Sequence, residues 1–202
     1  MPPFQQWFLE LVSIISDACV SIAAIAAIAG LWQWRRELVG KAKYELAHKI
    51  ILLALEFRGE LKLSRSVFLH PNESSGRFKS VDENPFEALI LDEYYARLSR
   101  LKPVESILNK LQEASWEAET ILSLDDSNLV QPFEEIYNEL KVSIFHYFDE
   151  KIIQSRAQYI GIDPKKMEEY LSTFKESEND SFSRKVDQVI SSLKGKYRRY
   201  IK

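Results

Sequence analysis

One stretch of apolar sequence constrains this chain more than any other feature. Residues 11–34 read LVSIISDACVSIAAIAAIAGLWQW and contain a single charged residue, Asp17. As an α-helix, 24 residues span roughly 36 Å, which exceeds the ~30 Å hydrocarbon core of a bilayer. The stretch therefore predicts a transmembrane helix at 11–34, preceded by a short external N-terminus at 1–10.

The residues that flank this stretch predict its direction in the membrane. Tryptophans gather at both membrane interfaces, and basic residues stay on the cytoplasmic side. The first ten residues contain no Lys or Arg, whereas two arginines follow the apolar stretch directly. We therefore expect an inner-membrane protein with its N-terminus outside and residues 35–202 in the cytoplasm. The predicted interface anchors are Trp7, Trp32, Trp34, Arg35 and Arg36.

Two other interpretations of the stretch are a cleaved signal peptide and a buried helix of a soluble protein. The sequence Ala27-Ile28-Ala29 resembles a signal-peptidase site. A signal peptide, however, begins with basic residues, and residues 1–6 contain none. The pair of arginines after the stretch is also typical of a stop-transfer flank. The membrane anchor is the favoured interpretation.

Small residues inside the stretch predict that the helix associates with copies of itself. In lipid, small residues four apart let two helix backbones approach closely. Asp17 and Ser21 are four residues apart, so they share one helix face. A carboxylate in a membrane usually faces a partner or water. Asp17 therefore either turns into an oligomer or reaches water at the outer interface. The predicted oligomerisation residues are Asp17, Ser21, Ala23, Ala26, Ala27 and Gly30.

The rest of the chain predicts an all-α fold, in which the membrane helix continues into a cytoplasmic antiparallel helical bundle at 35–202. Apolar residues recur at steps of three and four, and no alternating run indicates a strand. Proline inside a helix removes a hydrogen bond, so we expect a kink or break at Pro103. A polar loop is predicted at 70–84. Helices are expected at 35–68, 85–122, 130–157, 164–174 and 182–201.

Few residues in this chain could carry catalytic or metal chemistry. One cysteine and three histidines leave no cysteine-rich zinc site, and six glycines include no phosphate-binding loop motif. We expect no metal and no cofactor. One motif, Arg65 followed by His70, resembles the Arg–His signature of HEPN ribonucleases, which are helical bundles. That resemblance implies Arg65 on the scissile phosphate and His70 as general acid–base. Ser66 departs from the family pattern.

The charges of the chain are segregated along the sequence. Residues 81–180 contain ten basic and 22 acidic residues, a net charge of −12, whereas residues 181–202 carry +6. Such a basic end suits anionic lipid headgroups, and an acidic protein partner or a nucleic acid are the alternatives. With an anchor on the same chain, lipid is favoured and nucleic acid is least favoured. The predicted binding residues of the tail at 194–202 are Lys194, Lys196, Arg198, Arg199 and Lys202.

Two segments, Trp34-Arg35-Arg36-Glu37-Leu38 and Lys43-Tyr44-Glu45-Leu46-Ala47, follow directly on the Ala-rich stretch. This part of the chain resembles small, uncharacterised bacterial membrane-anchored helical proteins. The layout of one span and a helical bundle is also similar to the membrane accessory protein of type VI-B CRISPR systems. That similarity implies an oligomeric pore acting in antiphage defence.

These observations give three hypotheses about function. The first is a non-enzymatic, oligomeric inner-membrane protein that forms a pore or perturbs the membrane, with a cytoplasmic bundle that senses or docks a partner. The second is a monomeric or dimeric membrane tether that presents a helical interaction domain. The third is a membrane-tethered ribonuclease that uses Arg65 and His70. The expected partners are the lipid bilayer and further copies of the chain, and the sequence does not identify a protein partner.

Overall fold

All regular secondary structure in the described residues is helical. The computed structural model describes residues 3–70, 72–81, 83–122, 128–156, 163–176 and 180–201, with only the backbone described at 3–15, 17 and 18. Within these ranges every regular element is an α-helix, which confirms the predicted fold class. The helices are α1 (Pro3–Arg65), α2 (Pro85–Leu122), α3 (Gln131–Arg156), α4 (Pro164–Phe174) and α5 (Ser181–Ile201).

The chain divides into two compact units, which we describe separately. The first, Met1–Glu45, consists of the N-terminal part of α1, and the second, Leu46–Lys202, holds the rest of α1 and the other four helices. Residues 35–45 therefore belong with the first unit and not, as predicted, with the bundle. The physical reason is that the buried core begins at Leu46, since residues 35–45 include no buried side chain.

The first unit contains the predicted membrane segment. Within the residues that the structure describes, no helix has an apolar run of the length and hydropathy that a membrane span requires. The side chains at positions 11–15, 17 and 18 of the predicted segment lie outside the described set. The transmembrane helix therefore stays a prediction.

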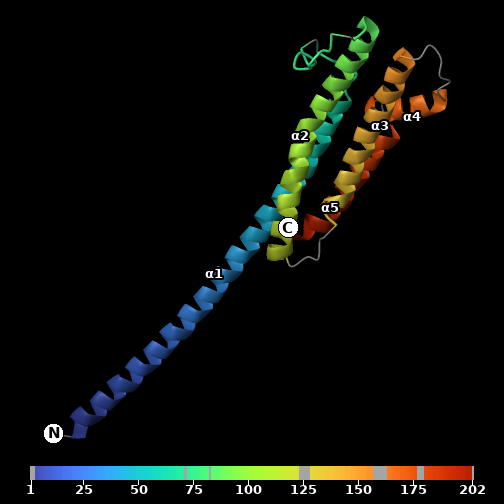
Figure 1. The fold of residues 1–202 in the computed structure, drawn as a ribbon. Helices are drawn as coiled ribbons and strands as arrows, with labels where there is room; N and C mark the ends of the chain where they lie inside the picture. Colours follow the sequence, from blue (N-terminus) through green and yellow to red (C-terminus); the bar gives the residue numbers. More distant parts are fainter. Residues whose placement is uncertain are drawn as a thin grey trace. The chain divides into compact units, whose positions relative to one another are not determined.

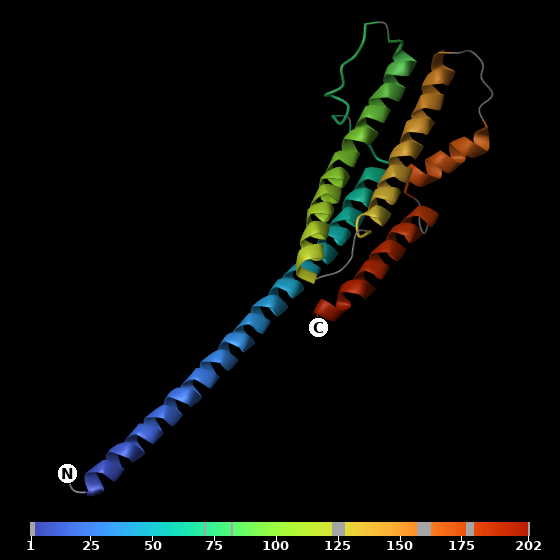
Figure 2. The ribbon, with the colours of Figure 1, turned by 60° about the horizontal axis from the view of Figure 1, so that its bottom comes forward.

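The second unit is a bundle whose helices alternate in direction. The C-terminal part of α1 runs one way, α2 returns, and α3 runs forward again (Figure 1). The fourth position is taken by α5, which runs antiparallel to α3, and the short α4 crosses obliquely before it (Figure 2). An up-and-down order of this kind is typical of helices joined by short connections. The antiparallel arrangement was predicted from the sequence.

The core of the bundle is formed by the apolar stripes that the sequence predicts. A stripe at steps of three and four lies on one helix face, and burying that face supplies most of a helix's stability. In α1 this stripe is buried, with Ile50 and Phe57 fully inaccessible. Phe57 meets Phe133 of α3 edge-to-face, with ring centroids 5.2 Å apart. The other predicted core residues of α3 and α5 that are buried are Ile136, Tyr137, Leu140, Ile144, Phe148, Phe182, Val186, Ile190 and Leu193.

Side-chain caps fix where three of the helices begin. Asn84 Oδ1 accepts from Glu87 N at 2.7 Å at the start of α2, as predicted. Asp163 accepts from Lys165 N at 3.0 Å at the start of α4, also as predicted. Asp180 accepts from Ser183 N at 2.6 Å at the start of α5. Asp180 lies in the polar stretch 175–181, where no cap was predicted, although Asp before a helix is a recognised start signal.

Two predicted boundaries are corrected. Helix α1 ends at Arg65 and not at Phe68, so the loop extends over 66–84 and not only 70–84. Of the kink or break predicted at Pro103, the break is wrong, because α2 is continuous from Pro85 to Leu122, and the kink stays a prediction. Pro103 is exposed, and the carbonyl that loses its helical donor, that of Ser99, lies one turn earlier on the same side. Solvent on that side can hydrate it, so the helix continues.

Replacing Gly59 by alanine should stabilise the bundle. Gly59 lies inside α1, is exposed, and has nothing within 4 Å of the position that a Cβ would occupy. Alanine removes the conformational entropy cost of a helical glycine, so Gly59→Ala should raise the free energy of unfolding by about 0.5–1 kcal/mol. Urea denaturation followed by circular dichroism measures this change.

The matched control is Gly76→Ala in the loop. A Cβ at Gly76 would lie 2.9 Å from Tyr95 Oη, and the residue is not helical. No gain is expected there. An equal gain in both variants would contradict the explanation from helix propensity.

Candidate functional site

Arg65, the proposed phosphate-binding residue, is buried at the end of α1. Its Nε donates to Thr173 O at 2.7 Å, and its Nη2 donates to Ser172 O at 3.1 Å and Lys175 O at 3.2 Å. These carbonyls belong to the C-terminal end of α4, where helices leave acceptors without an intrahelical donor. Arg65 therefore acts as a cap for α4.

The same guanidinium also binds the start of α5. Nη2 donates to Asp180 Oδ2 at 2.6 Å, and Nη1 donates to Ser183 Oγ at 2.8 Å. The side chains of Arg65 and Asp180 are 3% and 8% exposed, so this ion pair is buried. The guanidinium also lies over the Phe182 ring, 4.6 Å from its centroid. One side chain thus joins α1, α4 and α5.

This arrangement does not support the predicted ribonuclease site. All three guanidinium nitrogens of Arg65 already donate to protein acceptors, which leaves the residue poorly placed to hold a scissile phosphate. His70 lies in the loop and is exposed, and its backbone N–H donates to Glu73 Oε1 at 2.9 Å. The sequence motif is explained by a structural arginine followed by a loop histidine.

The loop 66–84 is fastened to α2 by two arginines that the sequence analysis did not single out. Arg100 makes a bidentate ion pair with Glu73, with Nε 2.6 Å and Nη2 2.7 Å from its carboxylate oxygens. Arg100 Nη1 and Arg97 Nη1 both donate to Ser66 O, at 2.9 and 2.8 Å. Cations at these carbonyls also suit the negative end of the α1 dipole.

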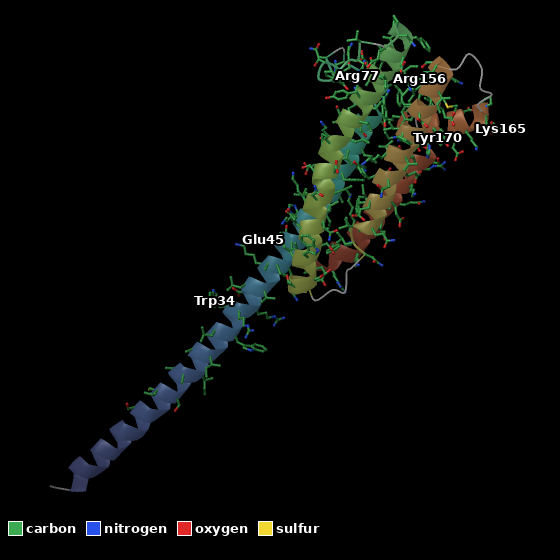
Figure 3. All side chains as sticks on the ribbon, in the orientation of Figure 1. Trp34, Glu45, Arg77, Arg156, Lys165 and Tyr170 are labelled. Carbon is green, nitrogen blue, oxygen red and sulfur yellow. The ribbon has the colours of Figure 1, made fainter. Side chains whose placement is uncertain are left out.

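Arg77 fastens the second half of the loop. Its Nη1 and Nη2 donate to the two oxygens of Glu83 at 2.9 and 2.8 Å, and its Nε donates to Asp92 at 2.6 Å. Arg77 lies in the loop beside α2 (Figure 3). The Arg77 hydrogen bonds, followed by the bond from Ser80 N, lower the pKa of Glu83 from 4.5 to about 2. The sequence gives no local signal for these pairs, because Arg77 and Asp92 lie 15 positions apart.

The segment around this loop exposes an unusual number of large apolar side chains. Phe78 is 92% exposed and Val81 fully exposed, although the backbone beside them is held by Arg77. Exposed apolar side chains on a fixed backbone are typical of interaction surfaces. We call these exposed apolar residues of the loop and the adjoining helix ends the loop surface. Its members are Leu63, Val67, Phe68, Phe78, Val81, Phe86 and Leu89.

In the first unit, the described residues of the predicted membrane site are exposed. Ser21, Ala23, Ala26, Ala27 and Gly30 all lie on the surface of α1. The interface anchors Trp32, Trp34, Arg35 and Arg36 are exposed as well. The side chains of Trp7 and Asp17 lie outside the described residues, so the predicted pairing of Asp17 with Ser21 is not tested.

The predicted basic tail is the last part of α5. Lys194, Lys196, Arg198 and Arg199 are exposed, whereas Lys202 lies outside the described residues. Tyr197 is fully buried in the core, and burial raises its pKa to about 12. Tyr197 is therefore not available to stack on bases, which removes part of the argument for nucleic acid.

The remaining chemistry-bearing residues stand apart from one another. His146 stacks on Tyr170 of α4, with ring centroids 5.5 Å apart, and His48 and Cys19 are exposed. In the part of the chain that the structure describes, no three His, Cys, Asp or Glu side chains gather as a metal site would require.

Comparisons with known proteins do not add to this picture. No protein-family model, curated protein or solved structure matches the chain. The functional argument therefore rests on the residues described above.

Replacing Arg65 should destabilise the bundle strongly. Arg65→Met leaves the buried Asp180 carboxylate and the α4 carbonyls without their donor, so the free energy of unfolding should fall by about 3–5 kcal/mol. Urea denaturation of the full-length chain measures the loss.

The same substitution at Arg58, also on α1, is the control. Arg58 pairs with Asp187 on the surface, with both side chains more than half exposed. Such pairs contribute about 0–1 kcal/mol. Equal losses in Arg58→Met and Arg65→Met would disprove the role assigned to Arg65.

The pKa of Glu83 should depend on Arg77. Because this pKa is lowered to about 2, the Arg77–Glu83 pair favours the folded loop fully above pH 4.5, and that contribution is lost as the pH falls toward 2. Arg77→Gln should return the pKa of Glu83 toward 4.5, which a carbon NMR titration of its carboxyl group measures. Lys79→Gln is the control, since Lys79 pairs with Asp92. A Glu83 pKa that Arg77→Gln leaves unchanged would contradict the pairing.

Proposed function

We propose that this chain is a single-pass inner-membrane protein that tethers a cytoplasmic helical interaction domain. The N-terminus lies outside, residues 11–34 cross the bilayer, and the bundle presents a docking surface for a protein partner. One observation carries the proposal: the large apolar side chains between positions 20 and 34 are all at least 60% exposed. They are Val20, Ile22, Ile25, Ile28, Leu31, Trp32 and Trp34.

The apolar side chains of such a helix must be buried against other protein or against lipid. Each large apolar side chain gains about 1.5–3 kcal/mol when it leaves water completely. A helix that is apolar on every side belongs in a protein core or in a membrane. Positions 22–28, Ile-Ala-Ala-Ile-Ala-Ala-Ile, contain no polar residue, so no side of the helix suits water. The flanking residues favour lipid as the environment that removes these side chains from water.

The flanks support an interfacial position for the end of this segment. Trp32 and Trp34 are exposed and are followed directly by the exposed Arg35 and Arg36. Aromatic rings and cations in this order suit the headgroup region of the cytoplasmic side. The exposed cations of α5 also favour binding to an anionic membrane surface, since each contributes about 1 kcal/mol near it.

The exposed apolar side chains of the loop surface support the proposed interaction domain. Arg100 of α2 holds the loop 66–84 through a bidentate ion pair with Glu73, and Arg77 of the loop pairs with Asp92 of α2. A partner that binds Phe68, Phe78 and Phe86 would therefore meet a backbone that is already ordered. Preorganisation of this kind lowers the entropic cost of binding.

A charge in the middle of the predicted span should release the protein from the membrane. Position 23 lies at the centre of residues 11–34, where arginine costs about 2.5–3.5 kcal/mol. Ala23→Arg should therefore shift the protein from the carbonate-resistant membrane fraction toward the carbonate extract. Sedimentation of membranes from expressing cells, followed by immunoblotting, measures the distribution.

Gln33→Arg supplies the matched control, because it adds the same charge beside Arg35 at the predicted interface. It should leave the protein in the membrane fraction. Full extraction of the unmodified chain by carbonate would contradict the anchor.

A second candidate function is an oligomeric membrane pore. The exposed small side chains of Ala23, Ala26 and Ala27 favour it, and Gly30 has nothing within 4 Å of a Cβ position, so neighbouring helices could approach closely here. In a ring, Asp17 and Ser21 would line a cation path, because acidic rings favour cations. We leave the antiphage role out of the proposal, since it rests on the architectural resemblance alone.

The mass of the full-length chain in detergent separates the two candidates. Light scattering behind size exclusion should give a monomer or dimer for the tether and six or more copies for the pore. In the second case, Asp17→Asn should reduce cation leakage from protein-containing vesicles, with Asp163→Asn in the bundle as the control. Leakage that Asp17→Asn leaves unchanged would contradict the pore.

A further inference from the structure

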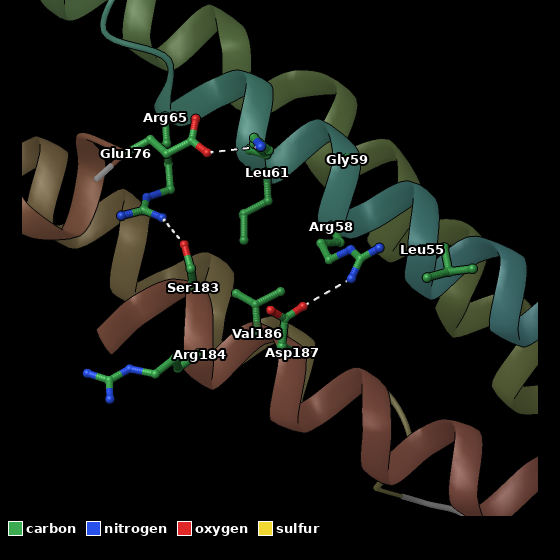
Figure 4. A pocket seen from close by; sticks show the side chains of 11 residues that line it. Leu55, Arg58, Gly59, Leu61, Arg65, Glu176, Ser183, Arg184, Val186 and Asp187 are labelled. Atoms are coloured by element: carbon green, nitrogen blue, oxygen red, sulfur yellow. Dashed lines mark hydrogen bonds and ion pairs between the residues drawn. The ribbon is translucent and has the colours of Figure 1, made fainter. Parts of the chain in front are cut away.

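A pocket of about 650 Å³ lies between α1 and the start of α5 (Figure 4). Its size falls in the range of small-molecule sites, which is roughly 300–1,000 Å³. Leu61 and Val186 point into the space between the two helices (Figure 4). Gly59 lies on its lining with open space where a side chain would be. The charged residues of the lining are Arg58, Lys62, Arg65, Arg184, Glu176 and Asp187.

The pocket carries a positive charge in a chain that is acidic overall. Apart from Arg65, whose charge the buried Asp180 balances, its three cations exceed its two carboxylates, whereas the whole chain has a formal charge of −3. A cleft lined by one sign of charge attracts ions of the opposite sign from solution. The pocket is therefore suited to an anion.

Two of these cations form ion pairs near the surface. Arg58 Nη1 lies 3.1 Å from Asp187 Oδ1, and Lys62 Nζ lies 3.3 Å from Glu176 Oε1. Arg58, Lys62 and Asp187 are all more than half exposed, unlike the buried pair of Arg65. Exposed pairs contribute little to stability, so an incoming anion can replace these carboxylates at small cost.

Two further donors lie on the α5 side of the pocket. Ser183 Oγ accepts from Arg65 Nη1, which leaves its own hydroxyl proton free to donate to a ligand. Arg184 is exposed, and in Figure 4 its guanidinium extends away from α1. No ion pair or hydrogen bond holds that guanidinium among the residues that the structure describes, so it can turn toward the pocket.

We propose that this pocket binds the phosphate group of a small anionic ligand. A phosphate has three or more acceptor oxygens that point in different directions, and arginine and lysine are its usual partners. Arg58 and Lys62 supply donors from α1, and Arg184 supplies donors from α5 once its side chain turns toward the pocket. The ligand is either a soluble phosphate compound or the headgroup of a phosphatidic acid, which share this chemistry.

Calorimetric titration of the full-length chain in a nonionic detergent tests the proposal. Inorganic pyrophosphate is the soluble probe, and dihexanoyl phosphatidic acid is the headgroup probe. Saturable binding of either one is expected, and the tighter of the two identifies the source. Absence of saturable binding for both probes would overturn the proposal.

Charge-removing variants locate the site. The double variant Arg58→Gln, Lys62→Gln and the single variant Arg184→Gln should each weaken binding tenfold or more. Arg198→Gln is the matched control, because Arg198 is an exposed arginine on the same helix but outside the pocket. Equal weakening by Arg198→Gln would show a general charge effect and refute the site.

A variant that changes no charge completes the test. Gly59→Phe should fill the pocket and abolish binding, while thermal denaturation and circular dichroism show that the bundle is still folded. A Cβ at Gly59 meets nothing within 4 Å, and phenylalanine favours a helix more than glycine does. Unchanged binding in a folded Gly59→Phe protein would place the anion elsewhere and overturn the proposal.

Discussion

The buried ion pair between Arg65 and Asp180 is the interaction on which the arrangement of the bundle depends. Arg65 ends α1 and caps the carbonyls of α4, and Asp180 begins α5. A buried charge is tolerated only when its hydrogen bonds are satisfied, so the three helix ends must meet at this point. The same junction forms one end of the pocket between α1 and α5. The geometry of that pocket is therefore a consequence of where the guanidinium lies.

The fold class and the core were predictable because their signals are local. A helix repeats its face every three to four residues, so the sequence alone shows which side chains belong inside. The stripes of α1, α3 and α5 are buried as predicted. The caps at Asn84 and Asp163 were predictable for the same reason, since each bonds a backbone group two or three positions away.

The polar contacts between residues far apart in the sequence were not predictable. Arg65 was given a phosphate-binding role because its neighbour in sequence, His70, completes a known pattern, whereas its partners lie more than 100 positions away. The Arg77–Asp92 and Arg100–Glu73 pairs present the same difficulty, because their members become neighbours only after α2 has formed. The break predicted at Pro103 was wrong because the rule that proline interrupts a helix does not consider whether the proline is exposed to solvent.

The separation of Arg65 and Asp180 along the chain has a consequence for synthesis. The two residues are 115 positions apart. At about 5–20 residues per second, translation of the intervening segment takes roughly 6–23 s. During that time the arginine has been made and its carboxylate has not, so α1 cannot dock in its final position. The apolar residues 11–34 precede all of this, and a membrane could receive them while the bundle is still incomplete. Closure of the helical domain is thus one of the last events in the production of the protein.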